Sequence, residues 1–455
     1  MSIRRSSIDM TEGPFLRKII KFAVPLILTG LLQSLYNAAD LIVVGKFEGD
    51  IALAAVGGTG SLTNLVVGVF MGLATGAGVC VAQFIGAKEE KKVNDVVHTS
   101  LLLSFILGIV IGILGFTFAP HMLSLMGTPD DVINHSILYL RIIFIGIPAS
   151  LAYNYSAAMV RSTGDTKHPL IFLSVSGIVN VALNCVLVIF FHMGVAGVAI
   201  GTIAAQYLSA ALMMIHMYRL DGYMHFSPRR LHIHSKMLRK LLYIGVPSGL
   251  QGSLFSLSNV LIQSSINSFG SAVMSGSAAA GNIEGFVYVA LNAFHHASLT
   301  FVGQNVGAKK FENIKKVAVN SVIAVVCLGV AIQGIVLIFS RPLLGLYASG
   351  EDVISEGLVR LFSIVSLYFI CGIMEIFSGA LRGMGRSITS MVISLSGACL
   401  FRIAWLETIF KIFRTPMCIY VSYPISWALT AAISLIFVII AVKNEKRKLG
   451  SLKTN

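Results

Sequence analysis

Charged side chains inside long apolar segments are the residues of this sequence that could do chemistry. Asp40 is the only charged residue between positions 22 and 45. A carboxylate buried in a membrane is energetically costly, so such a residue is by default a candidate functional site. It could take up a proton or bind a cation, and the alternative is an acid near a helix end that simply reaches water. The second half of the chain carries Glu284, Glu375 and Arg402 in similar surroundings.

The composition indicates that these residues lie in a membrane protein. The 455 residues are 56% hydrophobic and only 12% charged, whereas soluble domains are about a quarter charged. Apolar runs of roughly 20 residues recur along the chain, which predicts an all-α polytopic membrane protein without a cleavable signal. Twelve spans are expected near 16–44, 52–84, 94–118, 133–156, 167–191, 194–218, 239–266, 274–305, 317–340, 357–381, 388–410 and 415–442.

The net charge of +14 reflects the expected topology of the chain. With a cytoplasmic amino terminus, most of the 34 lysines and arginines fall in loops on the cytoplasmic side. The positive-inside rule therefore predicts that both termini are cytoplasmic. We expect the protein to lie in the inner (plasma) membrane. No nucleic-acid partner is expected, because the basic residues follow the loops.

The sequence contains an internal repeat at an offset of about 221 residues. Such repeats are typical of transporters, and six spans in each half predict two pseudo-symmetric lobes related by an axis along the membrane normal. The expected parts are an amino-terminal lobe (1–219), a cytoplasmic linker (220–238) and a carboxy-terminal lobe (239–455). The matched positions are Gln83, Gly86, Ala87 and Lys88 with Gln304, Gly307, Ala308 and Lys309; Arg161 and Gly164 with Arg382 and Gly385; and Val24-Pro25 with Val246-Pro247.

Two elements of the first half are expected to have special roles. Gly68, Gly72 and Gly76 recur every four residues, so they share one helix face that should pack closely on another helix. Pro25 lies inside the first span, where the missing backbone hydrogen bond allows a hinge. No glycine-rich loop ends in Lys-Ser or Lys-Thr, so ATP hydrolysis is not expected and any pumping must use an ion gradient. We expect a transporter without a cofactor, not an enzyme.

Four short motifs give the sequence a family resemblance. The segment 161–167 resembles the "LRGxGDTK" loop of the multidrug and toxic compound extrusion (MATE) transporters, and 381–385 is its second-half copy. The segments 304–308 and 194–197 also resemble loop signatures of that family. The resemblance covers essentially the whole chain and implies two six-helix lobes around a central cavity. It also implies export of amphipathic, often cationic, compounds in exchange for protons or sodium by a monomer.

The resemblance implies a coupling site in the amino-terminal lobe. The first-helix acid corresponds to Asp40, the fifth-helix polar pair to Asn180 and Asn184, and the sixth-helix hydroxyl to Thr202. At 1.5 Å per residue, Asp40 lies about 6 Å and Asn180 about 16 Å from the outer ends of their spans. The corresponding distances are about 10 Å for Asn184 and about 12 Å for Thr202. The context of Asp40 resembles the DinF-like branch of the family, and three further residues are assigned to the substrate cavity. These are Gln33, Tyr36 and Asn37.

Two coupling ions remain open for this cluster. Burial disfavours the charged form of a carboxyl group, so a proton could neutralise Asp40 and release a cationic substrate. Sodium could act in the same way through carboxylate, amide and hydroxyl oxygens, which hard cations prefer. Asn184 stands where the family commonly has an aspartate. The single negative charge therefore favours protons, and no other metal is expected.

The carboxy-terminal lobe carries a second polar cluster. Glu284 and Arg402 are expected about 15 and 12 Å from the outer ends of their spans, and we predict that they form an ion pair. This pair could be structural or could bind substrate. Glu375 lies about 27 Å deep, and we predict that it is the freer acid and attracts cations. Arg360 is expected near an outer helix end, with its head group reaching the interface.

Two other classes of function, a lipid flippase and a passive channel, fit the sequence less well than an exporter does. A flippase for a lipid-linked precursor, from the same wider superfamily, should line its cavity with arginines or lysines, whereas acids dominate here. A passive channel would need a repeated selectivity ring, which the sequence lacks. The sequence therefore predicts an ion-coupled exporter of small amphipathic compounds, with the flippase as the alternative.

Overall fold

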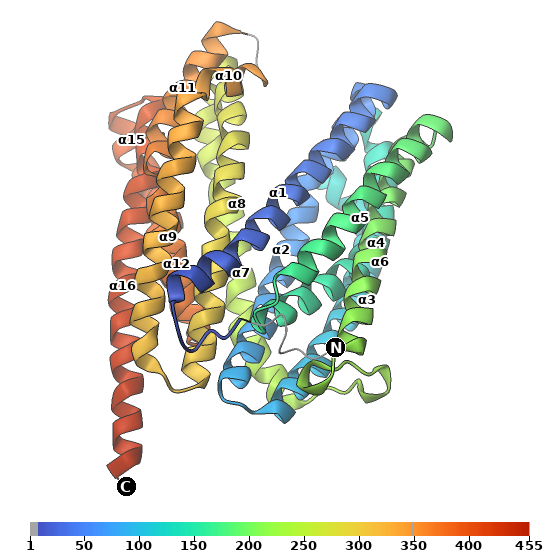
Figure 1. The fold of residues 1–455 in the computed structure, drawn as a ribbon. Helices are drawn as coiled ribbons and strands as arrows, with labels where there is room; N and C mark the ends of the chain where they lie inside the picture. The colour runs from blue at the N-terminus through green and yellow to red at the C-terminus, as the bar shows by residue number, and fades with distance from the viewer. Residues whose placement is uncertain (1–7, 348–349, 455) are drawn as a thin grey trace. The chain divides into compact units, whose positions relative to one another are not determined.

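The computed structural model of the protein describes residues 8–347 and 350–454, and in this part of the chain almost every residue is helical (Figure 1). The helices are α1 (Phe15–Glu48), α2 (Asp50–Gly86), α3 (Glu90–Leu125), α4 (Asp130–Ser162), α5 (Lys167–Cys185), α6 (Gly194–Arg219), α7 (Ser235–Asn267), α8 (Ser271–Gly307), α9 (Phe311–Ile338), α10 (Ser340–Gly345), α11 (Glu351–Ile364), α12 (Tyr368–Gly383), α13 (Ser387–Ser394), α14 (Phe401–Glu407), α15 (Ile409–Ile412) and α16 (Pro416–Thr454). Short 3-10 turns cover Gly222–Met224, Pro228–Arg230 and Val365–Leu367, and π-helical segments cover Val186–Phe190 and Leu395–Leu400.

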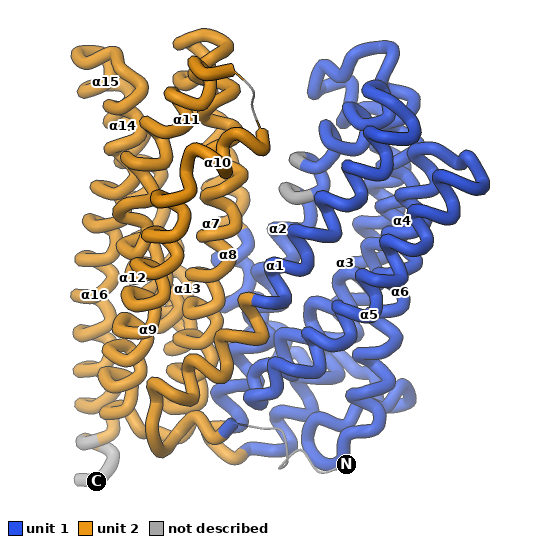
Figure 2. The backbone as a smooth tube through the Cα atoms, turned by 45° about the horizontal axis from the view of Figure 1, so that its top comes forward, with its two compact units in different colours: residues 1–8, 28–85, 89–249 blue, residues 9–27, 86–88, 250–455 orange. Residues whose placement is uncertain are grey.

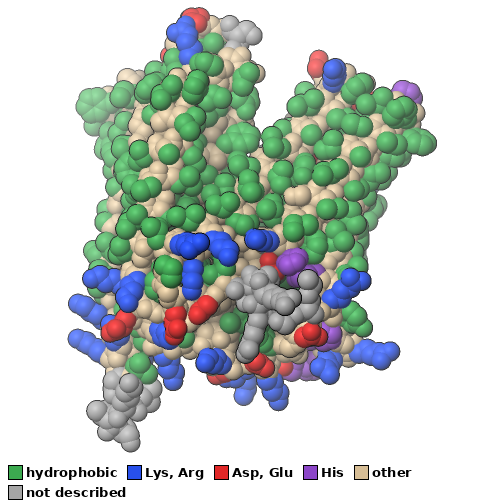
Figure 3. Space-filling view, viewed as in Figure 1, with side chains coloured by type: hydrophobic (Ala, Val, Ile, Leu, Met, Phe, Trp, Pro, Cys, Tyr) green, Lys and Arg blue, Asp and Glu red, His purple; other side chains and the backbone are tan. Residues whose placement is uncertain are grey.

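The helices have the length and apolarity of membrane spans. Nine helical segments of the described chain are long and apolar enough to cross a membrane. Together with α1, α7 and α8, each more than 30 residues long, they account for the twelve expected spans. Hydrophobic side chains cover the sides of the helices, while Lys and Arg gather toward one end (Figure 3). The all-α, multi-span fold class is therefore confirmed.

The chain forms two compact units, and the division between them falls in the middle of α1 and of α7 (Figure 2). The described part of unit 1 comprises residues 8, 28–85 and 89–249, and that of unit 2 comprises 9–27, 86–88, 250–347 and 350–454. The division therefore differs from the expected lobes of 1–219 and 239–455. The first half of α1 belongs to unit 2, and the first half of α7 belongs to unit 1. The two cuts, after Ile27 and after Gly249, fall at matching positions of the internal repeat.

Specific contacts fix the first half of α1 in unit 2. Phe22 packs edge-on against Phe301, with ring centres 5.7 Å apart. Before the helix begins, the carbonyl of Met10 accepts a hydrogen bond of 2.8 Å from Asn305 Nδ2. Because Asn305 is fully buried, this bond satisfies a polar group that would otherwise be costly to bury.

Glycines fix the first half of α7 in unit 1. A Cβ added at Gly72 of α2 would overlap the backbone nitrogen of Gly249, and one at Gly76 would lie 2.9 Å from the Cα of Gly245. The two backbones thus touch, which only glycine permits. The close packing predicted for this face is confirmed at Gly72 and Gly76. It is wrong at Gly68, where a Cβ would meet open space.

Candidate functional site

The polar residues predicted to form one layer in the first half of the chain do lie together in unit 1. Asp40, from the second half of α1, is buried with 8% of its surface exposed. Its Oδ1 accepts a hydrogen bond of 2.5 Å from Asn184 Nδ2 of α5. Its Oδ2 lies 3.3 Å from the Thr202 hydroxyl of α6, which in turn lies 3.4 Å from Asn180 Nδ2. Three helices thus converge on one carboxyl group.

A π-helical segment and a buried apolar cluster occur on the helices that carry these polar residues. The π-helical segment Val186–Phe190 begins two residues after Asn184. Such segments widen a helix and are frequent at functional sites. A buried apolar cluster that includes Val43, Val44, Val188 and Val198 lies on the same helices. Asp40 itself is buried, and in such a site a hydrogen bond is electrostatically stronger than in water.

The cluster has more acceptors than donors. The Thr202 hydroxyl carries one proton but faces two acceptors, Asp40 Oδ2 at 3.3 Å and the Val198 carbonyl at 2.9 Å. The amide oxygens of Asn180 and Asn184 are buried and have no hydrogen-bond partner among the described residues. An added proton or a small cation would remedy this deficit. The arrangement is therefore suited to exchanging one positive charge.

The three residues assigned to the substrate cavity occupy one stretch of α1 but differ in exposure. Gln33 and Asn37 are exposed, whereas Tyr36 is partly buried. The Tyr36 hydroxyl donates to the carbonyl of Ser174 at 3.3 Å, and its ring fills the space left by the missing side chain of Gly177. Tyr36 therefore ties α1 to α5, and the cavity role of all three residues stays a prediction.

In unit 2, the predicted ion pair between Glu284 and Arg402 is wrong. Glu284 of α8 binds Arg360 of α11 instead, through Nε to Oε1 at 2.8 Å and Nη2 to Oε2 at 2.9 Å. A third hydrogen bond of 2.6 Å runs from Arg360 Nη1 to Ser277. Both charged residues are buried, with 6% and 8% of their surfaces exposed. This bidentate, fully bonded geometry is typical of a structural pair.

The Glu284–Arg402 pair was predicted wrongly because the start of the helix that carries Arg360 was misplaced. The helix that carries Arg360 was expected to begin near residue 357, but α11 begins at Glu351. The earlier start places Arg360 about 9 Å deeper along the helix. Its head group therefore reaches Glu284 instead of the interface, and the expectation that it lies near a helix end is corrected as well.

Glu375, which was predicted to be the freer acid, also has a close partner. Its Oε2 lies 2.9 Å from Nδ1 of His295 of α8, and the same ring nitrogen lies 2.9 Å from the backbone carbonyl of Glu375. Arg402 has no acidic partner among the described residues. Its Nε donates to Ser426 at 2.9 Å, and its guanidinium lies 4.0 Å from the centre of the Tyr423 ring. Its buried Nη2 has no hydrogen-bond partner within residues 8–347 and 350–454.

Comparison with known proteins places this fold and these clusters in a family. The sequence model of the MatE family matches residues 25–186 and 247–405, which include Asp40, Asn180, Asn184, Glu284 and Glu375. The chain belongs to the MATE family. It is therefore a membrane transporter, and the family resemblance inferred from its loop motifs is confirmed.

Individual MATE relatives agree with this assignment. "Probable multidrug resistance protein YoeA" of Bacillus subtilis is 29% identical over 83% of this chain and 83% of its own length. The "FAD transporter" of Shewanella oneidensis is 23% identical over 85% and 86%. A solved structure of an outward-facing multidrug resistance MATE transporter matches with a TM-score of 0.90 at 19% identity, covering 96% of this chain and 98% of that one. This match confirms the twelve-helix, two-lobe fold.

Sequence reasoning missed several residues that the structure brings together. Arg360 and His295 were not recognised as the partners of the unit 2 acids. A second cluster, Asp165 with His168 and His216, was missed because 161–167 was read only as a MATE loop motif. The spacing of Asp165 and His168, three residues apart, is a local signal, but nothing in the sequence connects them with His216, almost 50 residues later.

Proposed function

We propose that this MATE transporter exports amphipathic, cationic organic compounds in exchange for protons, by alternating access, with Asp40 as the coupling residue. The observation that carries the proposal is a buried carboxyl group held only by neutral donors. Among the described residues, Asp40 has no Lys, Arg or His partner. Its charge is therefore available to a proton or to a cationic substrate, unlike that of a carboxylate in an ion pair.

The hydrogen-bond pattern supports a proton as the coupling ion. When Asp40 is protonated, its Oδ2 donates to Thr202, and the Thr202 hydroxyl donates to Val198. Asn184 and Asn180 then supply the remaining donors, to Asp40 Oδ1 and to Thr202. When Asp40 is ionised, the Thr202 hydroxyl can donate its single proton either to Asp40 Oδ2 or to the Val198 carbonyl, but not to both. Proton uptake thus changes the bonds that join α1 to α6, which is the change a coupled cycle needs.

The names of relatives and the balance of charges support the substrate class. The Bacillus subtilis relative and the structural match are both described as multidrug resistance proteins. Asp40 and Glu375 supply negative charge within the spans. Basic groups lie near Glu375, namely His295 at 2.9 Å and the Arg382 guanidinium, whereas none among the described residues pairs with Asp40. A cationic drug would therefore gain most from the charge of Asp40.

The first test is efflux of a fluorescent organic cation from proteoliposomes under an imposed proton or sodium gradient. We expect the proton gradient to drive efflux in the wild type. Asp40→Asn should reduce efflux to the rate of protein-free liposomes, because asparagine can reproduce the bonds of the protonated state but cannot release a proton. The protein should still fold, since donors and acceptors remain matched.

Asp50→Asn is the matched control, because Asp50 is an exposed acid at the start of α2 in the same unit. It should keep wild-type efflux. Wild-type efflux by Asp40→Asn would remove Asp40 from the mechanism. Efflux driven by sodium alone would replace the proton with Na⁺. The amide oxygens of Asn180 and Asn184, which have no partner in the described part of the chain, would favour that outcome. Failure of both gradients with every cation tested would contradict the exporter.

A second candidate is the transfer of an anionic, lipid-linked precursor across the membrane. Arg402 favours it, because this buried guanidinium has no carboxylate partner among the described residues and one of its nitrogens is unbonded. Binding of an anionic lipid analogue that is lost in Arg402→Gln, with no cation efflux by the wild type, would establish this alternative.

We propose the same orientation that the positive-inside rule predicts, with both termini in the cytoplasm and the protein in the plasma membrane. The gathering of Lys and Arg toward one end of the helices supports it (Figure 3). Assignment to the DinF-like branch and function as a monomer are further parts of the proposal.

A further inference from the structure

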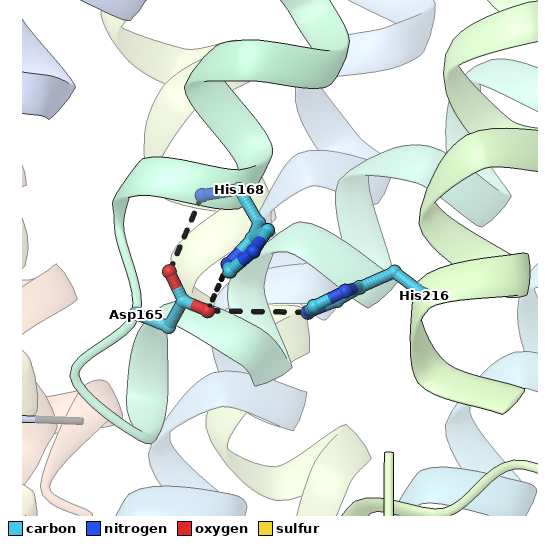
Figure 4. A group of neighbouring side chains, drawn as sticks. All are labelled: Asp165, His168 and His216. Carbon is cyan, nitrogen blue, oxygen red and sulfur yellow. Dashed lines mark hydrogen bonds and ion pairs between the residues drawn. The ribbon is translucent and has the colours of Figure 1, made fainter. Parts of the chain in front are cut away.

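Three side chains to which the proposed transport cycle gives no role meet where the loop between α4 and α5 approaches the end of α6 (Figure 4). Asp165 lies in the loop, His168 in the first turn of α5, and His216 in the last turn of α6. The two imidazole rings stack with their centres 4.2 Å apart and their planes 25° apart. Asp165 is buried, and both histidines are partly buried.

The polar atoms of the three side chains converge on one point. Asp165 Oδ2 lies 2.5 Å from His168 Nδ1 and 3.9 Å from His216 Nε2. All three atoms lie within 4.8 Å of one another. Two ligands of a tetrahedral zinc ion, each about 2.0–2.2 Å from the metal, are necessarily no more than about 4.4 Å apart. Small side-chain rotations would therefore bring all three atoms into coordination distance.

His216 supplies an independent observation. Its Nε2 is buried and has no hydrogen-bond partner in the described part of the chain. The carboxylate oxygen it faces is 3.9 Å away, which is too far for a hydrogen bond. Leaving a buried ring nitrogen unbonded is costly, so the position calls for a partner that lies between the two atoms.

The loop holds Asp165 so that one oxygen stays directed at the imidazoles. Its Oδ1 accepts the backbone N–H groups of Lys167 and His168, both at 3.2 Å, at the start of α5. Gly164, with a φ of +95°, makes the turn that places the aspartate there. The carboxylate is thus positioned by backbone contacts before any ligand arrives.

We propose that Asp165 Oδ2, His168 Nδ1 and His216 Nε2 form a binding site for a divalent transition metal of the zinc class. Two imidazoles and one carboxylate are a donor set that Zn²⁺ accepts, with water in the fourth position. The site would join the start of α5 to the end of α6. These helices also carry Asn184 and Thr202, which bind Asp40.

A metal ion bound at this site would therefore connect α5 and α6, the two helices whose side chains bind Asp40. Along α5, His168 lies about 18 Å from Asn180, and along α6, His216 lies about 21 Å from Thr202. A metal bound there touches neither the coupling residue nor its partners. It fixes the separation of α5 and α6 at the opposite end from the Asp40 cluster.

The test is titration of the purified full-length protein, with any purification tag removed, using Co²⁺ as a spectroscopic probe and Zn²⁺ as its competitor. We expect one equivalent of Co²⁺ to give the visible absorption bands of a four-coordinate ion, and Zn²⁺ to abolish them. His168→Gln and His216→Gln should each weaken binding at least tenfold, because even the loss of an outer-shell group costs that much.

Two further variants sharpen the result. Asp165→Asn keeps the oxygen that accepts the backbone N–H groups, so it should fold normally while binding Co²⁺ more weakly. His135→Gln, an exposed histidine on α4, should bind like the wild type. A wild-type protein without visible Co²⁺ bands would overturn the proposal. So would affinities for the three cluster variants equal to that of His135→Gln.

Discussion

At the scale of single residues, the buried charges of this transporter divide into two kinds. Arg360 and Glu284 satisfy each other with two hydrogen bonds, and Ser277 takes a third. Asp40, by contrast, is held by an amide and lies beside a hydroxyl, neither of which neutralises it. A paired charge stabilises a single arrangement of helices, whereas an unpaired one responds to the ions that reach it.

Removing one partner of the unit 2 pair should therefore destabilise the fold. Arg360→Met leaves Glu284 buried without a countercharge, which costs about 3–5 kcal/mol. Thermal unfolding in detergent should show a clear drop in the melting temperature. The double variant Glu284→Met, Arg360→Met should recover most of it, since apolar replacements of buried pairs are well tolerated.

Arg341→Met serves as the control for this prediction. Arg341 and Glu351 form an exposed pair, and such pairs contribute at most about 1 kcal/mol. A melting temperature for Arg360→Met as high as that of Arg341→Met would show that the buried pair is not structural.

The sequence allowed the Asp40 cluster to be predicted but not the partners in unit 2. Depth along a helix depends on where that helix begins, and Asp40, Asn184 and Thr202 lie on helices whose ends were placed nearly correctly. Arg360 lies on a helix that begins six residues earlier than expected. His295 could not be paired with Glu375, because the contact depends on how α8 packs against α12.

At the scale of elements, glycine decides how closely two helices approach. Gly72 of α2 and Gly249 of α7 bring their backbones into contact within unit 1. This contact anchors the first half of α7, and it follows the spacing of the glycines along α2. The twelve spans were predictable from their apolar lengths, whereas the π-helical segments beside Asn184 and before Arg402 left no pattern in the sequence.

Gly72→Ala should lower stability, because the new Cβ would overlap the backbone of Gly249. In contrast, Gly68→Ala should leave stability unchanged or raise it slightly, since its Cβ meets open space and alanine favours a helix by about 1 kcal/mol. The two substitutions are one helical turn apart and identical in chemistry. Equal melting temperatures for the two variants would contradict the close packing.

At the scale of the whole molecule, α1 links the two units. It is a continuous helix from Phe15 to Glu48, yet its residues up to Ile27 belong to unit 2 and those from Leu28 to unit 1. Pro25 lies two residues before this division. The helix lacks a backbone donor there, so bending costs less than elsewhere in α1.

The hinge role of Pro25 can be tested with Pro25→Ala. Alanine restores the backbone donor and stiffens α1, so we expect transport to slow several-fold while the melting temperature stays equal or rises. Pro120→Ala is the control, because Pro120 lies inside α3 and that helix belongs entirely to unit 1. Wild-type transport by Pro25→Ala would show that α1 need not bend there.

The reciprocal division of α1 and α7 also bears on how such a protein could arise by duplication. Each repeat contributes the first half of its own first helix to the other unit, so neither repeat has a complete unit of its own. If the two repeats were separate chains, each would have to exchange the first half of its first helix with the other in order to fold. This is the arrangement of a domain-swapped dimer. This transporter is equivalent to such a dimer whose two subunits have been fused into a single polypeptide.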